Sequence, residues 1–280
     1  MIVPGSTSQS LAAALAVETD RRVADVAYDR FPDGEQLAAV PGFDGDEAVV
    51  VCATVDDAAH LQLLQLQDAC REAGAERITT VIPYMGYARQ DDVFDIGQPI
   101  SARAVARAIS TGCDRVVLIS PHEPAVADRF DVPVAVVDAA PLLAGALPSL
   151  ADPLFLAPDA GAVEFADAVC DAYGHGETDH FEKTRHSGSE VSVDPHDTEA
   201  AGRDVVVVDD IVATGATMSA AIDGLDKPAQ TVVACVHPVL VRNARSRLAR
   251  AGVDAVHATD TVEQPCSTVT AAPVVADALE

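Results

Sequence analysis

The stretch that decides the fold runs Arg203-Asp-Val-Val-Val-Val-Asp-Asp-Ile-Val-Ala-Thr-Gly-Ala-Thr-Met-Ser-Ala220. It opens with four consecutive valines, Val205 to Val208, and a β-branched run of this kind predicts a strand buried on both faces of a parallel sheet. Asp209 and Asp210 follow where that strand should end, and a turn of small and hydroxyl residues at 214–217 precedes a helical pattern. The expected order is therefore strand, acidic pair, turn and helix.

This order suits a phosphorylated sugar. Small residues let backbone N–H groups converge on a phosphate, the start of a helix adds partial positive charge, and threonine hydroxyls add donors. Two carboxylates can accept hydrogen bonds from sugar hydroxyls or bind Mg²⁺. The alternative is an ordinary strand–turn–helix in which aspartate caps the helix. The stretch resembles the phosphoribosyl-binding loop that phosphoribosyltransferases and phosphoribosyl pyrophosphate synthetases share, and the loop alone does not separate those two classes.

The composition is strongly acidic. The chain has 280 residues, with 44 acids against 18 bases and a formal net charge of −26. Such a surface stays soluble where salt screens its self-repulsion, and it is typical of salt-loving microbes. No basic stripe is present, which disfavours binding of nucleic acid. Only two bases are lysines, Lys183 and Lys227, so a lysine inside a motif-like segment is expected to have a function.

The cysteines and the apolar runs exclude other classes. None of the six cysteines forms a CxxC pair or alternates with histidine at metal-ligand spacing, so we expect buried free thiols. No apolar run reaches membrane-spanning length, and the alanine-rich residues 8–18 lack a basic leader. We therefore expect a cytoplasmic protein that makes no contact with a membrane.

The order of elements predicts the architecture. Strand and helix patterns alternate along both halves of the chain, which predicts an α/β fold of two doubly wound parallel sheets of the phosphoribosyltransferase type. We expect an N-terminal domain over 1–138 and a C-terminal domain over 139–264. A tail over 265–280 is expected to pack back on the N-terminal domain.

Further candidate residues lie beyond expected strand ends, where α/β folds place ligands. Arg89 and Gln90 follow one strand, and a flat guanidinium suits a triphosphate. Asp159 follows another strand and could be a helix cap or equally a metal ligand. His122 also follows a strand, although a lone histidine is more often structural than a ligand. Lys183 and Arg185 are two apart and so share one side of an extended strand, which suggests an anion site, although a solvated hairpin remains the alternative.

Taken together, five segments resemble one family, the ribose-phosphate pyrophosphokinases, in the expected order and over nearly the whole chain. They are Phe31-Pro-Asp-Gly-Glu35, Pro83-Tyr-Met-Gly-Tyr-Ala-Arg-Gln-Asp91, Pro158-Asp-Ala-Gly161, Glu182-Lys-Thr-Arg185 and the loop at 209–217. By itself the first of these reads as a plain hairpin turn. The fourth is most similar to archaeal members.

The resemblance implies transfer of the β,γ-diphosphoryl group of ATP to the anomeric hydroxyl of ribose 5-phosphate, with Mg²⁺ as cofactor. It also implies a homo-oligomer, a dimer or a hexamer built from dimers, in which the 31–35 loop reaches a neighbouring subunit's site. The implied residues are Phe31, Asp33, Gly34, Glu35, Arg89 and Gln90 for ATP; Arg185, Asp209, Asp210, Ala213, Thr214, Gly215, Ala216 and Thr217 for ribose 5-phosphate; His122 and Asp159 for Mg²⁺; and Lys183 and Arg185 for catalysis.

The chain departs from the family pattern at a few positions. Ala213 stands where many members have an acid, Ala216 where glycine is common, and Ser120-Pro121 where an Asp-Leu pair is frequent. These departures concern the metal geometry and regulation more than the reaction. A purine or pyrimidine phosphoribosyltransferase would explain residues 203–220 but not the first half, and a non-catalytic regulatory homologue would not need the cations and metal-ligand candidates.

Overall fold

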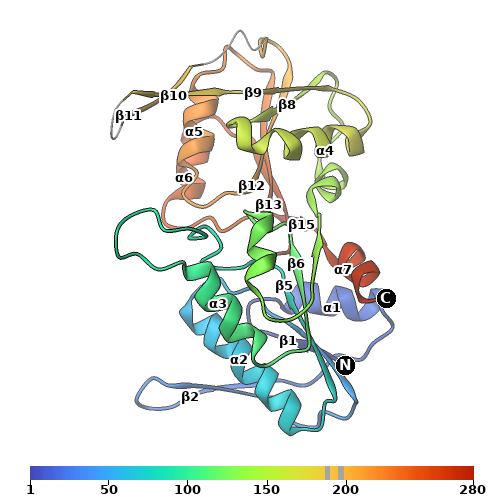
Figure 1. Ribbon diagram of the computed structural model, residues 1–280. Helices are drawn as coiled ribbons and strands as arrows, with labels where there is room; N and C mark the ends of the chain where they lie inside the picture. The colour runs from blue at the N-terminus through green and yellow to red at the C-terminus, as the bar shows by residue number, and fades with distance from the viewer. Residues whose placement is uncertain (187–189, 195–198) are drawn as a thin grey trace. The chain divides into compact units, whose positions relative to one another are not determined.

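The structure is a computed structural model that describes residues 1–186, 190–194 and 199–280; for 182–186 and 190–194 it describes the backbone alone. The chain divides into two compact units (Figure 1). Unit 1 comprises Met1–Asp138, Asp260–Glu263 and Thr270–Glu280, and unit 2 comprises Ala139–Thr259 and Gln264–Val269. Each unit has a parallel sheet and a hydrophobic core of its own.

The sheet of unit 1 has five parallel strands in the order β1-β4-β5-β6-β7. Side chains alternate between its faces: Ala48 and Val50 of β4 join the core beneath α2 and α3, whereas Val49 and Val51 are buried on the other face. Both faces are therefore apolar, which is why the strand sequences read as continuous hydrophobic runs. The strands are β1 (Ile2–Pro4), β4 (Glu47–Val51), β5 (Arg77–Ile82), β6 (Arg115–Ile119) and β7 (Val134–Val137).

Helices cover both faces of this sheet. Figure 1 shows α2 (Asp57–Glu72) and α3 (Ser101–Ser110) on one side, and α1 (Gln9–Glu18) packed against α7 (Ala272–Leu279) on the other. Asp56 begins α2, and its side chain accepts a hydrogen bond from the backbone N–H of Ala59 at 2.8 Å. A short 3₁₀ turn, η1 (Pro124–Arg129), precedes β7. A separate antiparallel hairpin, β2 (Ala27–Arg30) and β3 (Gln36–Ala39), packs on α2.

The sheet of unit 2 has six parallel strands in the order β15-β14-β13-β12-β8-β9. The four valines of the opening stretch lie in β12 and are buried, as predicted. Helices α5 (Ala216–Asp223) and α6 (Ala244–Arg250) pack on one face, and α4 (Val163–Tyr173) with the 3₁₀ turn η2 (Ala140–Ala146) packs on the other. The strands are β8 (Pro153–Ala157), β9 (Glu177–His180), β12 (Asp204–Ile211), β13 (Gln230–His237), β14 (Ala255–Thr259) and β15 (Ser267–Val269).

The two parallel sheets with helices on both faces confirm the predicted fold class. A further antiparallel pair, β10 (Glu182–His186) with β11 (Glu190–Asp194), belongs to unit 2. All six cysteines are buried free thiols, also as predicted. Within the described ranges, no helix is both long enough and apolar enough to cross a membrane.

Candidate active site

The loop between β12 and α5 in unit 2 has the form of an anion cradle. Gly215 begins α5 with φ of +68°, a left-handed conformation that favours glycine, and a Cβ there would lie 3.3 Å from Cγ of Leu248. No side chain in the described part of the chain caps this helix. The first N–H groups of a helix lack partners within it, and Thr214 and Thr217 are exposed beside them. The start of α5 therefore presents backbone and hydroxyl donors to a phosphate.

Main-chain hydrogen bonds from the end of β13 and the segment after it hold this loop in place. The N–H of Val212 donates to the carbonyl of His237 at 3.1 Å, and the carbonyl of Val212 accepts from Leu240 at 2.9 Å. The carbonyl of Ala213 accepts from the N–H of Val241 at 3.0 Å. Because these bonds use the main chain, the alanine at 213 keeps the loop anchored although it supplies no acid.

Carboxylates gather at the carboxyl ends of β8 and β12, which are neighbouring strands. Asp210 is buried and Asp209 is half-buried. Burial, together with the negative charges of Asp210 and then Asp159, raises the pKa of Asp209 to about 8. Such a carboxyl favours a ligand that supplies positive charge or hydroxyl donors. Among the described residues, no group of three or more His, Cys, Asp or Glu side chains is arranged to hold a metal ion.

In unit 1, the loop that follows β5 is tied to the end of β4. Thr54 donates its backbone N–H to the carbonyl of Tyr84 at 2.8 Å, and its hydroxyl accepts from the N–H of Gly86 at 3.0 Å. A Cβ at Gly86 would lie 2.1 Å from the carbonyl oxygen of Thr54, closer than any side chain allows. Glycine is therefore required at 86 for the two segments to approach.

Tyr87 extends this attachment to the start of α2. Its backbone adopts φ of +64°, its hydroxyl donates to Asp57, and its ring lies 5.5 Å from the ring of His60. The ring nitrogen Nε2 of His60 is buried and has no hydrogen-bond partner in the described part of the chain. We call Tyr87, Asp57 and His60 the tyrosine brace. It fixes the turn immediately before Arg89.

Arg89 and Gln90 lie on this braced loop. Arg89 is exposed, whereas Gln90 is half-buried and its carbonyl accepts from the N–H of Ala102 in α3 at 3.1 Å. The side-chain nitrogen of Gln90 donates to Gln98 and to the carbonyl of Asp92, each at 3.3 Å. Gln90 therefore orders its own loop, while the guanidinium of Arg89 faces solvent.

The turn at 31–35 closes the β2–β3 hairpin, as its Asp-Gly pair alone would predict. The N–H of Phe31 donates to the carbonyl of Glu35 at 2.7 Å, and Gly34 adopts φ of +96°. Asp33 accepts from the N–H of Glu35 at 3.1 Å, and Arg30 donates to the carbonyl of Gly34 at 2.7 Å. The Phe31 side chain remains 46% exposed, which leaves its ring available for stacking.

His122 and Asp159 each follow a strand, but they belong to different units. His122 is exposed and follows Ser120, whose φ of +37° marks a sharp turn after β6. Asp159 caps η3 (Ala160–Ala162) by accepting from the N–H of Gly161 at 3.0 Å. The cap uses one carboxylate oxygen of Asp159.

Lys183 and Arg185 lie in β10. Their backbones pair with Val193 and Val191 of the antiparallel strand β11. This agrees with the extended conformation expected of the segment. Their side chains lie outside the described part of the structure.

Some residues near these loops carried no motif in the sequence. The tyrosine brace depends on contacts between segments that are about 30 positions apart, as in the bond from Tyr87 to Asp57. Gln62 is a polar residue buried in α2. The sequence could have singled out Gln62 only as a polar residue at a position expected to be buried in a helix.

Comparison with known proteins shows which family the chain belongs to. Residues 1–112 match the family described as the N-terminal domain of ribose phosphate pyrophosphokinase, and residues 149–268 match the phosphoribosyl transferase domain family. A solved structure, the phosphoribosylpyrophosphate synthetase from Mycobacterium smegmatis, is 28% identical with a TM-score of 0.81, and the match covers 100% of this chain and 97% of that one.

Curated relatives match along their full length. A ribose-phosphate pyrophosphokinase from Halobacterium salinarum is 63% identical over 281 residues, covering 100% of both chains. Another from Methanopyrus kandleri is 42% identical over 287 residues, covering 100% of this chain and 98% of the relative. The resemblance drawn from the five sequence segments is confirmed, and the chain belongs to the ribose-phosphate pyrophosphokinase family of enzymes.

Proposed function

We propose that the chain transfers the diphosphoryl group of ATP to the anomeric hydroxyl of ribose 5-phosphate, which gives phosphoribosyl pyrophosphate and AMP. The observation that carries this proposal is the loop after β12. A half-buried and a buried carboxylate occur there with the start of α5, which no described side chain caps, within nine residues at 209–217. That pairing suits a ribose 5-phosphate, with its phosphate on the N–H groups of α5 and its hydroxyls on the acids.

The ribose end is assigned to unit 2. Thr214, Gly215, Ala216 and Thr217 would hold the phosphate through main-chain and hydroxyl donors. Asp209 and Asp210 would accept hydrogen bonds from the ribose hydroxyls, and Ala213 would contribute only its anchored backbone. A carboxyl with a raised pKa suits this role, since hydroxyl donors supply the stabilisation that burial removes from its charged form.

The ATP end is assigned to unit 1. Arg89 is a permanently charged donor at a strand end and would contact the triphosphate. Gln90 would keep that loop ordered and bind ATP beside it. The exposed ring of Phe31, with Asp33 to Glu35 on the same turn, would contact adenine. In an oligomer this contact is made in a neighbouring subunit's site, as the family resemblance implies.

The donor types present fit a Mg²⁺ cofactor. Mg²⁺ is usually held by one or two protein ligands with waters and substrate phosphates, rather than by a cage of side chains. The family resemblance assigns His122 and Asp159 to Mg²⁺. When bound, Mg²⁺ would neutralise charge on the triphosphate oxygens.

The reaction needs positioning and charge neutralisation more than covalent chemistry. The anomeric oxygen of ribose 5-phosphate attacks the β-phosphorus, the bond from that phosphorus to the α,β-bridging oxygen breaks, and AMP leaves. The anomeric hydroxyl loses its proton in the process. Lys183 and Arg185 are assigned to the charge that develops on the migrating diphosphate and on AMP.

We further propose that the chain forms a homo-oligomer. The loop after Arg89 exposes apolar side chains to solvent, although the chain is strongly acidic overall. The exposed fractions are 50% for Val93, 66% for Phe94 and 99% for Ile96. Exposed apolar side chains clustered in this way are typical of protein interfaces. Light scattering in concentrated salt should give a mass above 29.0 kDa, and Phe94→Ser with Ile96→Ser should lower it. A monomeric wild type would contradict the proposal.

One assay tests the reaction. The chain is incubated with ATP, Mg²⁺ and ribose 5-phosphate over a range of salt concentrations, and the nucleotides are separated. We expect AMP that depends on ribose 5-phosphate. No AMP at any salt concentration would overturn the proposal. Release of pyrophosphate from phosphoribosyl pyrophosphate when a purine or pyrimidine base is added would instead support a phosphoribosyltransferase.

A further inference from the structure

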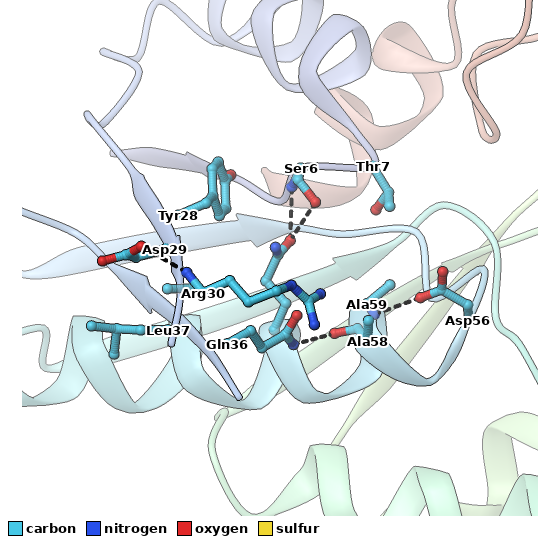
Figure 2. A pocket seen from close by; sticks show the side chains of 12 residues that line it. Ser6, Thr7, Tyr28, Asp29, Arg30, Gln36, Leu37, Asp56, Ala58 and Ala59 are labelled. Atoms are coloured by element: carbon cyan, nitrogen blue, oxygen red, sulfur yellow. Dashed lines mark hydrogen bonds between the residues drawn. The ribbon is translucent and has the colours of Figure 1, made fainter. Parts of the chain in front are cut away.

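Unit 1 contains a pocket that the proposed reaction does not use. It has a volume of about 460 Å³ and lies between the residues after β1, the β2–β3 hairpin and the first turns of α2 (Figure 2). None of the residues assigned above to ATP, ribose 5-phosphate or Mg²⁺ lines it. Its volume falls within the range of about 300–1,000 Å³ that is usual for small-molecule sites.

One side chain at this pocket is mostly buried, yet one of its polar atoms bonds to no other described residue. The side chain of Gln62 is only 8% exposed. Its Oε1 accepts two hydrogen bonds from Ser6, from the backbone N–H at 2.8 Å and from the hydroxyl at 3.0 Å. Because a backbone N–H can only donate, these bonds fix which end of the amide is oxygen. The nitrogen Nε2 has no hydrogen-bond partner in the described part of the chain, and it is not sealed from solvent. A fixed donor is thus left for a ligand.

A cation lies on the same wall. Arg30 lines the pocket, and in Figure 2 its side chain extends toward Ala58 at the start of α2. One guanidinium nitrogen donates to the carbonyl of Gly34 at 2.7 Å. The other guanidinium nitrogens have no partner among the described residues. Arg30 and Gln62 together offer donors suited to a planar oxyanion.

Acceptors line other parts of the pocket. The hydroxyls of Ser6 and Thr7 donate to Gln62 and to the carbonyl of Ala53, and the Thr7 hydroxyl also contacts the Cys52 thiol at 3.7 Å; each hydroxyl oxygen still has a lone pair to accept with. Asp56 uses one carboxylate oxygen to cap α2, which leaves the second. Asp29 also contributes a carboxylate. These groups suit a ligand that donates hydrogen bonds or carries positive charge.

The balance of charge selects the ligand class. One arginine and two aspartates line the pocket, so a dianionic phosphate would meet a net negative environment. A single carboxylate on Arg30 and Gln62, with an ammonium group on Asp56 and the hydroxyls, satisfies both sets of groups. Apolar surface of Tyr28 and Leu37 remains for a side chain. We propose that this pocket binds a small zwitterion of the α-amino-acid class.

Binding is tested with the full chain in concentrated salt, without ATP or ribose 5-phosphate, so that the result does not depend on the proposed reaction. The twenty common amino acids are screened at millimolar concentration by thermal shift and calorimetry. For L-leucine, the matched probes are L-leucinamide, which lacks the carboxylate, and 4-methylpentanoate, which lacks the ammonium group. Inorganic phosphate is the competing anion.

We expect saturable binding of at least one amino acid, with each matched analogue that lacks a charge at least about tenfold weaker. Gln62→Glu should abolish binding, because it keeps both bonds from Ser6 but replaces the free donor with a negative oxygen. The control is Gln264→Glu in unit 2, where Oε1 accepts from Arg245 at 3.0 Å and the same charge is added; it should leave binding unchanged.

Three outcomes would overturn the proposal: no amino acid binds, phosphate binds in preference, or Gln62→Glu binds as well as wild type. Circular dichroism checks that Gln62→Glu is folded. If it is not, Arg30→Gln replaces it, because this change removes the cation from a solvent-exposed side chain. Undiminished amino-acid binding by Arg30→Gln would contradict the assignment in the same way.

Discussion

Lys183 is the residue on which the proposed chemistry depends most, and it stands out because the chain has only one other lysine. We predict that Lys183→Ala loses about 3–4 kcal/mol of transition-state stabilisation, the usual cost of removing one oriented donor. Steady-state turnover with ATP and ribose 5-phosphate measures this. The matched control is Lys227→Ala, an exposed lysine between α5 and β13, which should keep wild-type turnover. Near-normal turnover of Lys183→Ala would show that the catalytic assignment is wrong.

Asp209 should make the stability of the ligand-free chain depend on pH. Its pKa in the folded state is raised from 3.8 to about 8, chiefly by burial, so the folded chain holds this proton more tightly than the unfolded chain does. The stabilisation is complete below pH 3.8 and is lost as pH rises through about 8. Urea unfolding in fixed salt should therefore show a free energy of unfolding that falls over this window.

The variant that tests this prediction is Asp209→Asn, whose side chain cannot titrate. It should lose the part of the pH dependence of the free energy of unfolding that Asp209 causes. Asp223→Asn, an exposed change at the end of α5, should retain it. An unchanged slope in Asp209→Asn would mean that other groups account for the pH dependence. The sequence predicts that the acidic pair lies at the end of a strand, and the structure places it there. The raised pKa of Asp209 could not be predicted, because burial and the approach of Asp159 depend on how β8 and β12 pair.

At the scale of elements, the loop after β5 is fixed by contacts that no local pattern encodes. The prediction that it binds a ligand rests on its place after a strand and on the Arg89–Gln90 pair. Its shape depends on Thr54 and on the tyrosine brace, which come from other elements. The β12–α5 loop is the opposite case, because strand, turn and helix are contiguous and each part has its own sequence signal.

We predict that Tyr87→Phe raises the KM for ATP severalfold and leaves the KM for ribose 5-phosphate unchanged. The change keeps the ring beside His60 but removes the hydroxyl bond to Asp57 that helps to fix the loop. Tyr173→Phe is the control, since it removes a hydroxyl that donates to Pro148 in unit 2, at 2.8 Å. Equal effects on both KM values would indicate a general loss of stability rather than a role in positioning the loop.

For the whole molecule, the fold could largely be predicted from the sequence. Alternating strand and helix patterns were enough to predict two parallel sheets, because strands buried on both faces read as apolar runs. The pocket beside Gln62 could not be predicted, because it is enclosed by a loop, a hairpin and a helix from separate parts of unit 1.

We predict that the free energy of unfolding rises with KCl concentration near neutral pH. With a net charge of −26, the acidic side chains repel one another in the folded state, which destabilises it. Salt weakens this repulsion because it shortens the screening length from about 10 Å at 0.1 M to about 3 Å at 1 M. The rise should be smaller near pH 4.4, the isoelectric point, where the net charge vanishes. A salt effect of equal size at both pH values would show that self-repulsion is not its cause.

In the proposed reaction, the bond between the α,β-bridging oxygen and the β-phosphorus of ATP breaks while the β,γ bond stays intact. The most direct test uses two ATP analogues with ribose 5-phosphate and Mg²⁺, one with a methylene group in the α,β bridge and one with it in the β,γ bridge. We predict that the β,γ-methylene analogue yields AMP and a phosphonate analogue of phosphoribosyl pyrophosphate, while the α,β-methylene analogue is inert. Turnover of the α,β-methylene analogue, with the β,γ-methylene analogue inert, would contradict diphosphoryl transfer.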